Sequence, residues 1–419
     1  MGLDHQLDEK VQVTYKYRIY PSKEQEKELF RTIGVCKGAY NIGLYYCIER
    51  YRNNKEHTSK FDLNYYYKEL ASTEERAWLK TVHSQILQNV SSRIMAAFNM
   101  FFKKLNHFPK FKGKHDVRSF TYPQSGFKLT NKNKKIYLSG IGNVKIVYHR
   151  PIIGKIKTCT VYHNACNQWF VSFVAIQSKE EFYKKSNATK VVGIDLGLDD
   201  FLVLSDGYYV PNQDFYRRKE KKIKKLSRRK DKKQKGSRNR EKARLRLAKA
   251  HQQIKNRRSD FLWKLCHHLV NNYLVIGLED IESVSFMTSN HSLAKSEYDV
   301  SWSMFRSRLE YESYKYQTLI GFVDKNNTTQ NCCQCGKKVQ KDISVRTHKC
   351  PYCGIVLNRD LNAAINILNR IPKEWRFDLD STAGNAGIHA HGDTTSTTVM
   401  VPAMTPLQIA SCIIEVGRY

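Results

Sequence analysis

The spacing of apolar residues changes once near the start of the chain. Residues 11–20, VQVTYKYRIY, alternate between apolar and polar types and are rich in β-branched and aromatic side chains, which predicts a strand. Ser22 then offers a helix N-cap, with Glu24 and Glu26 in the first turn, where acidic side chains are favoured. From there to about residue 105 the apolar positions recur at helical spacing, so a helical block is predicted.

A second change of pattern comes at residue 109. Residues 109–185 hold short alternating runs separated by turn residues, among them KIYLSGIGNVKIVYHR, TCTVYHN and QWFVSFVAIQ. Short strands at this spacing are typical of a small β-barrel or sandwich. Because the first strand lies far upstream of the others, we expect the helical block to be an insertion into one β-domain.

Strands and helices alternate in the rest of the chain. Strands are predicted within residues 186–210 and at LVIGLEDI and LIGFVD, and helices at DFLWKLCHHLVNNY, over residues 302–319 and from about Asn358 to Asn369. The pattern weakens beyond Gly392, which predicts a C-terminal tail with at most a marginal helix. The predicted fold class is α+β, in several domains.

Charge gives the first indication of a partner. The 419 residues include 71 Lys and Arg but 39 Asp and Glu, for a formal net charge of +32. Such a surplus destabilises a compact chain by self-repulsion unless a polyanion neutralises it. Nucleic acid is therefore the first partner expected, and an anionic membrane surface the second. The opening segment MGLDHQLDEK is polar and no apolar run approaches the roughly 20 residues that span a bilayer, so we expect a soluble intracellular protein with no membrane contact.

The densest charge lies in residues 217–246, where 18 Lys and Arg stand against three Asp and Glu. Few helix breakers apart from Gly236 occur there, and helical spacing continues beyond it, so a basic helix over residues 217–258 is predicted. A run of charge is often only a solvated helix face. At this density Lys and Arg occur on every face, which fits a groove with phosphates on more than one side.

Three carboxylates stand at the ends of predicted elements. Asp195 follows the apolar run VVGI, Glu279 follows VIGL, and Asp360 opens a helix. Two divalent metal ions held by hard oxygen ligands can drive phosphodiester hydrolysis, so three converging acids predict a Mg²⁺ site. Glu279 and Asp280 are adjacent in a strand and point to opposite faces, so only one of them can join Asp195. Asp360 has a second interpretation, as an acid favoured at a helix N-terminus.

Two CxxC pairs predict one structural Zn²⁺ site. Fourteen residues separate the pairs, and a glycine follows each pair and permits a tight turn around a metal. Four thiolates leave no open coordination position, so the site is not catalytic. Cys333 and His348 are interpreted as non-ligands, and the predicted ligands are Cys332, Cys335, Cys350 and Cys353. With the acids and the charge, this indicates a metal-dependent enzyme acting on nucleic acid.

Together these motifs resemble those of the transposon-encoded TnpB (OrfB) nucleases, of the compact type V CRISPR effectors that descend from them, and of eukaryotic Fanzors. VTYKYRIYPSKEQEKELFRTIGVCKGAYN resembles the family's opening and FPKFKGKHDVRSFTYP its mid-chain β-element. GIDLGLDDFLVLSDG, GLEDI, the CxxC pairs and NRDLNAAINI resemble its RuvC-like nuclease core with an inserted zinc finger, and GNAGIHAHGD resembles the element after the third acid. The resemblance covers nearly the whole chain.

The resemblance implies an order of domains. A wedge-type β-barrel would comprise residues 1–22 and 109–188, with a helical recognition domain, residues 23–108, inserted in it. An RNase H-like (RuvC) α/β nuclease domain would follow over residues 189–394. This domain would contain the basic helix and, at residues 327–357, a four-cysteine zinc finger; residues 395–419 would form the tail.

The resemblance also implies an RNA-guided DNA endonuclease that cleaves double-stranded target DNA beside a short transposon-adjacent motif. Asp195, Glu279 and Asp360 would hold two Mg²⁺ ions, which Mn²⁺ could replace, and a guide RNA from the transposon end would select the target. The protein would act as a monomer or dimer on its RNA. It would be cytoplasmic and nucleoid-associated in a prokaryote, and nuclear only as a eukaryotic homologue.

Contacts with nucleic acid follow from the same resemblance. WLKTVHSQILQN resembles the stretch that lies against the adjacent-motif duplex, and its Ser84 and Gln88 share one helix face. Glutamine can pair with adenine in the major groove, although Gln88 could also be a solvated helix residue. The basic helix would follow the guide–target heteroduplex through Arg217, Arg218, Lys221, Lys225, Arg228, Arg229, Lys232, Arg238 and Arg240.

Two other functions stay open. A catalytically silent RNA-guided DNA-binding regulator of the same family would share the fold, the charge and the zinc finger, so the acids alone distinguish it. A transposase that joins DNA strands itself would also use three acids, but the zinc finger and the N-terminal part fit guided cleavage better.

Overall fold

The computed structural model of the chain describes residues 10–113, 116–130, 132, 134–280, 301–324, 326–342 and 345–375. These residues form two compact units that divide between Phe182 and Tyr183. Each unit is an α+β structure built around its own hydrophobic core.

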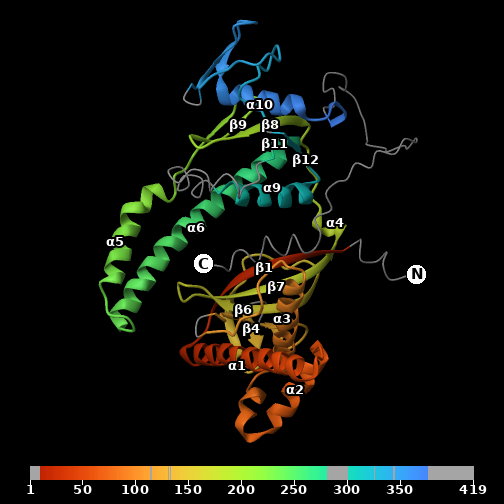
Figure 1. Cartoon of the computed structure of the whole chain (residues 1–419), viewed down its shortest axis with the longest axis vertical. Helices are drawn as coiled ribbons and strands as arrows, with labels where there is room; N and C mark the ends of the chain where they lie inside the picture. The colour runs from red at the N-terminus through yellow and green to blue at the C-terminus, as the bar shows by residue number, and fades with distance from the viewer. Residues whose placement is uncertain are drawn as a thin grey trace, which may run out of the picture. The chain divides into compact units, whose positions relative to one another are not determined.

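The first unit contains a seven-stranded, nearly closed, barrel-like sheet (Figure 1). Its strand order is β2-β6-β7-β1-β5-β4-β3. Strand β1 pairs antiparallel with both β5 and β7, although about a hundred residues separate it from them in the chain. Strand β1 therefore belongs to the same sheet as strands that follow the helical block in the chain. The strands are β1 (Lys10–Tyr20), β2 (Ser119–Tyr122), β3 (Phe127–Thr130), β4 (Lys135–Leu138), β5 (Gly142–Val147), β6 (Lys155–His163) and β7 (Trp169–Ser178).

The inserted helices begin where the sequence predicts. The side chain of Ser22 accepts a hydrogen bond from the Gln25 amide, and Gln25 in turn caps Ser22, which forms a capping box at the start of α1. Glu24 and Glu26 fall in the first turn. The helices of this unit are α1 (Lys23–Asn54), α2 (Lys60–Ser72), the 3-10 helix η1 (Glu74–Thr81), α3 (Ser84–Phe102) and α4 (Lys179–Phe182).

The second unit is built on a five-stranded sheet of order β10-β9-β8-β11-β12. The first three strands of this unit, β8, β9 and β10, form an antiparallel meander, whereas β11 and β12 run parallel to β8. The mixed sheet therefore has its parallel part at the centre and at one edge. The strands are β8 (Lys190–Leu196), β9 (Asp200–Leu204), β10 (Tyr209–Pro211), β11 (Tyr273–Glu279) and β12 (Leu319–Val323).

Helices cover both faces of this sheet (Figure 1). Val192 and Ile194 of β8 belong to one hydrophobic core with Leu262 of α6 and Phe305 of α9, whereas Gly193 between them lies against α10. Strand alternation thus assigns one face to α10 and the other to α6 and α9. The helices are η2 (Arg217–Lys219), α5 (Glu220–Asp231), α6 (Arg238–Asn272), α9 (Trp302–Tyr316), α10 (Arg359–Arg370) and η3 (Lys373–Trp375).

The expectation of one basic helix over residues 217–258 is wrong. The segment is a hairpin in which α5 and α6 lie side by side (Figure 1). The chain reverses at Gly236, whose φ of +84° is open to glycine at little cost, and Ser237 then caps α6 by accepting from the Arg240 amide. Beyond the turn, α6 continues without a break through DFLWKLCHHLVNNY to Asn272.

The expected tail, its marginal helix and the GNAGIHAHGD element lie outside the described residues. Among the residues that are described, none of the helices is both long and apolar enough to cross a bilayer.

Candidate active site and metal centre

Parallel pairing places two of the three predicted acids at one edge of the sheet. In the register of β8 and β11, Ile194 lies opposite Leu278, so the next residues along the strands are Asp195 and Glu279. Carboxyl ends of neighbouring parallel strands meet at the same edge of a sheet. The structure therefore brings Asp195 and Glu279 together, as the sequence predicts.

A row of glycines lets α10 lie directly on the strands that carry these acids. Gly193, Gly277 and Gly321 occupy matching positions on β8, β11 and β12. A Cβ atom on Gly193 would overlap the carbonyl oxygen of Ala364, and one on Gly277 would lie 2.6 Å from Ile371 Cδ1. Because Gly193 and Gly277 stand two residues before the acids on their strands, Asp195 and Glu279 point to the face that α10 covers.

Asp360 reaches this site from the first turn of α10. The helix cap comes from Asn358, whose side-chain oxygen accepts from the amides of Asp360 at 2.7 Å and of Leu361 at 3.2 Å. The side chain of Asp360 is thus not needed as the N-cap. Its carboxylate instead contacts Arg359 Nε at 3.0 Å and Arg346 Nη1 at 3.6 Å.

The electrostatics show that the three acids share one environment. Burial raises the pKa of the Asp195 carboxyl well above its usual range, and the negative charges of Glu279 and Asp360 raise it further, against the opposing effect of Arg359. Asp195 is 7% exposed. Three carboxylates whose negative charges act on one another, one of them buried, are hard-oxygen groups of the kind that a divalent cation such as Mg²⁺ prefers.

The two neighbouring acids at the end of β11 face different surroundings. Glu279 accepts a 2.5 Å hydrogen bond from the Thr328 hydroxyl. Asp280 forms a 2.9 Å ion pair with Arg306 of α9, which packs on the opposite face of the sheet. Strand alternation therefore separates them, as the sequence predicts.

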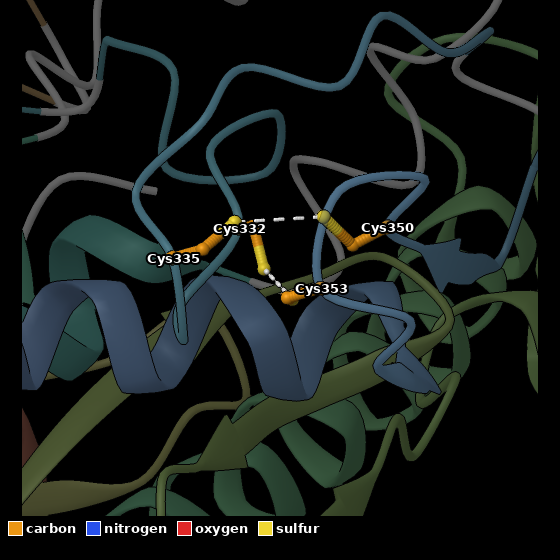
Figure 2. Close-up of side chains that lie close together, drawn as sticks. All are labelled: Cys332, Cys335, Cys350 and Cys353. Carbon is orange, nitrogen blue, oxygen red and sulfur yellow. Dashed lines mark hydrogen bonds between the residues drawn. The ribbon is translucent and has the colours of Figure 1, made fainter.

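The four cysteines of the CxxC pairs converge in a second site (Figure 2). Their sulfur atoms all lie within 4.8 Å of one another, and the distances Cys332 Sγ–Cys353 Sγ and Cys335 Sγ–Cys350 Sγ are both 3.6 Å. A disulfide needs about 2.05 Å. A tetrahedral zinc with Zn–S bonds of about 2.3 Å places sulfur atoms about 3.8 Å apart, so the cluster fits zinc.

The two halves of this cysteine module, residues 327–358, are built alike. The Gly336 amide donates to the Cys332 carbonyl at 2.9 Å, and the Gly354 amide donates to the Cys350 carbonyl at 3.0 Å. Both glycines have positive φ, +72° and +75°, in keeping with the tight turns that the sequence predicts. Burial alone would raise the pKa of the Cys350 thiol, but hydrogen bonds from the backbone amides of Cys353 and Tyr352 and from the neighbouring thiols outweigh it and lower the pKa.

The two cysteine-module residues interpreted as non-ligands have other contacts. The Cys333 amide donates to the side-chain oxygen of Asn362, and the Nδ1 atom of His348 lies 2.8 Å from Lys341 Nζ. Neither belongs to the cluster of sulfur atoms.

Asparagines of α10 join the cysteine module to the acids, and sequence reasoning did not identify them. The side-chain amides of Asn362 and Asn366 donate to the carbonyl oxygen of Asn331 at 2.8 and 2.7 Å. Asn366 also donates to the carbonyl of Thr328, the residue that holds Glu279. The signal is present in the sequence, because residues four apart on a helix share one face.

Arg346 is a second residue that sequence reasoning missed. It belongs to the cysteine module, and its guanidinium bridges Asp360 and Asp199, on the turn after β8. The amide of Arg359 also donates to the Arg346 carbonyl at 2.8 Å. A lone arginine between two CxxC pairs gives no sequence signal for this contact, because the fold of the module creates it.

The predicted nucleic-acid contacts lie in different settings. Ser84 and Gln88 are exposed on one face of α3. Arg240 is half-buried, and its guanidinium donates to the carbonyls of Lys230 and Lys233 at the end of α5, so it holds the hairpin together. The other predicted contacts on this hairpin are exposed: Arg217, Arg218, Lys221, Lys225, Arg228, Arg229, Lys232 and Arg238.

Three family models match the chain. Residues 173–290 match OrfB_IS605, described as "Probable transposase", and residues 302–367 match the Cas12f1-like TNB domain. Residues 11–56 match HTH_OrfB_IS605, described as a helix-turn-helix domain. In the structure this last segment is strand β1 followed by the single helix α1.

Similar proteins span almost the same length. A protein of Streptomyces pristinaespiralis named "Putative RNA-guided DNA endonuclease" is 33% identical over 86% of this chain and 89% of its own length. One of the same description from Escherichia coli (strain K12) is 28% identical over 84% of this chain and 91% of its own length. The structure of a Cas12f1–sgRNA–target DNA complex shares the fold, with a TM-score of 0.54 at 14% identity over 86% of this chain and 99% of that chain.

Proposed function

The chain belongs to the TnpB (OrfB) family, and from this premise we propose that it is a metal-dependent, RNA-guided endonuclease that cleaves double-stranded DNA beside a short adjacent motif. The observation that carries the proposal is that Asp195 and Glu279 lie side by side at one edge of the sheet, with Asp360 of α10 near enough for its charge to raise the pKa of Asp195. The sheet is a three-stranded meander followed by two parallel strands, and acids stand at the ends of its strands β8 and β11. This arrangement supports an RNase H-like (RuvC) nuclease domain.

The residues around the three acids orient the carboxylates and partly neutralise their charge, which suits the acids to bind metal ions. Asp195, Glu279 and Asp360 would bind two Mg²⁺ ions, which when bound supply an activated water and stabilise the leaving oxygen. Thr328 fixes the orientation of Glu279 through its hydroxyl. Arg346 and Arg359 neutralise part of the carboxylate charge, and the exposed Arg346 lies where it could also meet a phosphate.

The cysteine module has a structural role in this proposal. Cys332, Cys335, Cys350 and Cys353 would hold one Zn²⁺ with no open position. Hydrogen bonds between the module and the side chains of Asn362 and Asn366 would fix α10, and Thr328, which belongs to the module, would hold Glu279. Zinc would thereby hold two of the three acids in place without touching the substrate.

The partners follow from family membership and charge. We assign a guide RNA from the transposon end and a double-stranded DNA target, with the exposed basic side chains of the α5–α6 hairpin on the phosphates of the heteroduplex. The domain assignment is a wedge barrel (1–22 and 109–188), a recognition domain (23–108) whose Ser84 and Gln88 face the adjacent motif, and a nuclease domain (189–394).

The experiment starts from the RNA that co-purifies with the full-length protein. The RNA is sequenced, and a plasmid is built with the matching target flanked by randomised bases. The proposal predicts cleavage that requires Mg²⁺, stops with EDTA and is lost when the RNA is digested or the target is mismatched. Specific binding to the plasmid without cleavage under any metal would instead indicate the silent regulator, and cleavage independent of RNA would contradict guidance.

A further inference from the structure

A cavity of about 260 Å³ adjoins Glu279 on the face of the second sheet that α9 covers. Leu196, Leu278 and Phe322 form one side of it, at the carboxyl ends of the parallel strands β8, β11 and β12. The other side comes from the N-terminal half of α9. Crevices outside the carboxyl ends of parallel strands are where sheets of this kind bind ligands.

Aromatic rings from α9 and β12 line the cavity. Phe305 is fully buried, whereas Trp302 and Phe322 are partly exposed. The guanidinium of Arg306 lies 3.9 Å from the ring centroid of Phe322, and its Nε atom is held by Glu310 at 3.0 Å. Flat apolar surfaces beside a fixed cation suit a planar ligand that stacks.

Polar groups of α9 border the same space. Within the described ranges of the chain, the indole Nε1 of Trp302 is buried without a hydrogen-bond partner, although a buried tryptophan N–H usually has an acceptor. Ser303 and Ser307 also line the cavity, and their hydroxyls can donate or accept. A fitting ligand therefore has flat faces and hydrogen-bonding edges, which are the properties of a nucleobase.

We propose that this cavity takes one unpaired base of the DNA strand being cut, close to the phosphate that the three acids hydrolyse. The base would stack on Trp302 and accept a hydrogen bond from its indole N–H. Because a base must leave its stack to enter such a cavity, the site would favour single-stranded over duplex DNA. The choice of DNA as ligand rests on the proposed function.

The binding test uses the full-length protein freed of nucleic acid and a single-stranded DNA of about ten nucleotides that contains 2-aminopurine, a fluorescent base whose emission falls when it stacks. Ca²⁺, which takes oxygen ligands, replaces Mg²⁺ to limit cleavage. We expect wild type to quench the fluorescence, and Trp302→Ala to bind about 10-fold more weakly with the quenching lost. Trp302→Phe should keep much of the quenching, because it keeps an aromatic ring.

Trp263→Ala is the matched control, since it removes a tryptophan of α6 that lies outside the cavity. Thermal melting shows whether each variant is folded. Ser307→Leu fills the cavity without removing Trp302 and should also abolish quenching, so it decides the matter if Trp302→Ala does not fold. Quenching by Trp302→Ala or Ser307→Leu equal to that of wild type, an equal loss in Trp263→Ala, or equal quenching with duplex DNA would overturn the site.

A second arm locates the base along the strand. Guided cleavage is measured on targets in which one nucleotide near the cut lacks its base. One such position should slow wild type about 10-fold but cost Trp302→Ala nothing further, because the variant has already lost the stacking surface. Additive losses, or no sensitive position, would overturn the assignment. Quenching that depends on Trp302 in a wild type that cleaves no guided target would support the base site and overturn the proposed function alone.

Discussion

The amide of Cys333 donates a 2.9 Å hydrogen bond to the side-chain oxygen of Asn362, a fully buried residue of α10 that follows shortly after Asp360. One end of α10 is thereby fastened to the turn between Cys332 and Cys335. The position of a nuclease acid thus depends on the integrity of the cysteine module.

Loss of zinc should therefore affect stability and cleavage together. We expect one zinc per chain by elemental analysis, and we expect Cys350→Ser to lower both the melting temperature and the cleavage rate, since a structural zinc contributes folding free energy. Cys333→Ser is the matched control, because the contact of residue 333 with Asn362 uses the backbone amide. Absence of zinc from freshly purified wild type would refute the assignment.

The glycine row gives a prediction about geometry. Gly193→Ala should lower the free energy of unfolding by about 3 kcal/mol or more and reduce cleavage, because the new methyl group would overlap the backbone of α10 and displace Asp360. Gly34→Ala on α1 is the control, since nothing lies within 4 Å of its Cβ position and alanine there should stabilise the helix by up to about 1 kcal/mol. Denaturant unfolding measures both, and a neutral Gly193→Ala would show that α10 does not rest on β8.

The buried Asp195 predicts a pH dependence of stability in metal-free protein. Its pKa is raised in the folded state, so above the unfolded pKa of about 4 the unfolded chain loses its proton first, and stability falls as pH rises until the folded pKa is passed. Asp195→Asn should remove this loss, so that the variant melts above wild type at neutral pH but not at pH near 4. Added Mg²⁺ should stabilise wild type alone. Parallel stability–pH curves for the two proteins would contradict the burial of this charge.

The basic hairpin predicts a change in salt dependence without a change in target choice. Replacing Lys221, Lys225, Arg228 and Arg229 by glutamine should weaken binding to all sequences and flatten the salt slope by about 0.7–0.9 for each phosphate that is no longer neutralised. Arg31→Gln/Arg52→Gln on α1 is the control, because both arginines are already paired with glutamates. An altered target preference at an unchanged slope would argue against phosphate contacts.

Much of the fold could be predicted because local patterns determine it. The alternation in VQVTYKYRIY, the cap at Ser22 and the apolar runs before Asp195 and Glu279 all lie within single elements, and the structure has those elements there. The hairpin was not predicted because only Gly236 and the helix cap at Ser237 mark the turn, and the apolar spacing is helical on both sides of it.

The parts of the site that could not be predicted depend on contacts between distant segments. The contact of Arg346 with Asp360 requires the folded cysteine module, and the role of Gly193 appears only once α10 is seated on β8. Asn362 and Asn366 could be predicted only in part. Their four-residue spacing is visible in the sequence, but their acceptors on the turn of residues 328–331 are not.

If Glu279 forms the metal site with Asp195 and Asp360, Glu279→Gln and Asp280→Asn should differ sharply in cleavage. Both changes remove one negative charge at adjacent positions, but Asp280 faces Arg306 on the other side of the sheet. With guide RNA, matching plasmid and Mg²⁺, we expect Glu279→Gln to abolish cleavage while target binding persists, and Asp280→Asn to cleave at close to the wild-type rate. Cleavage by Glu279→Gln at the wild-type rate, or an equal loss in both variants, would contradict it.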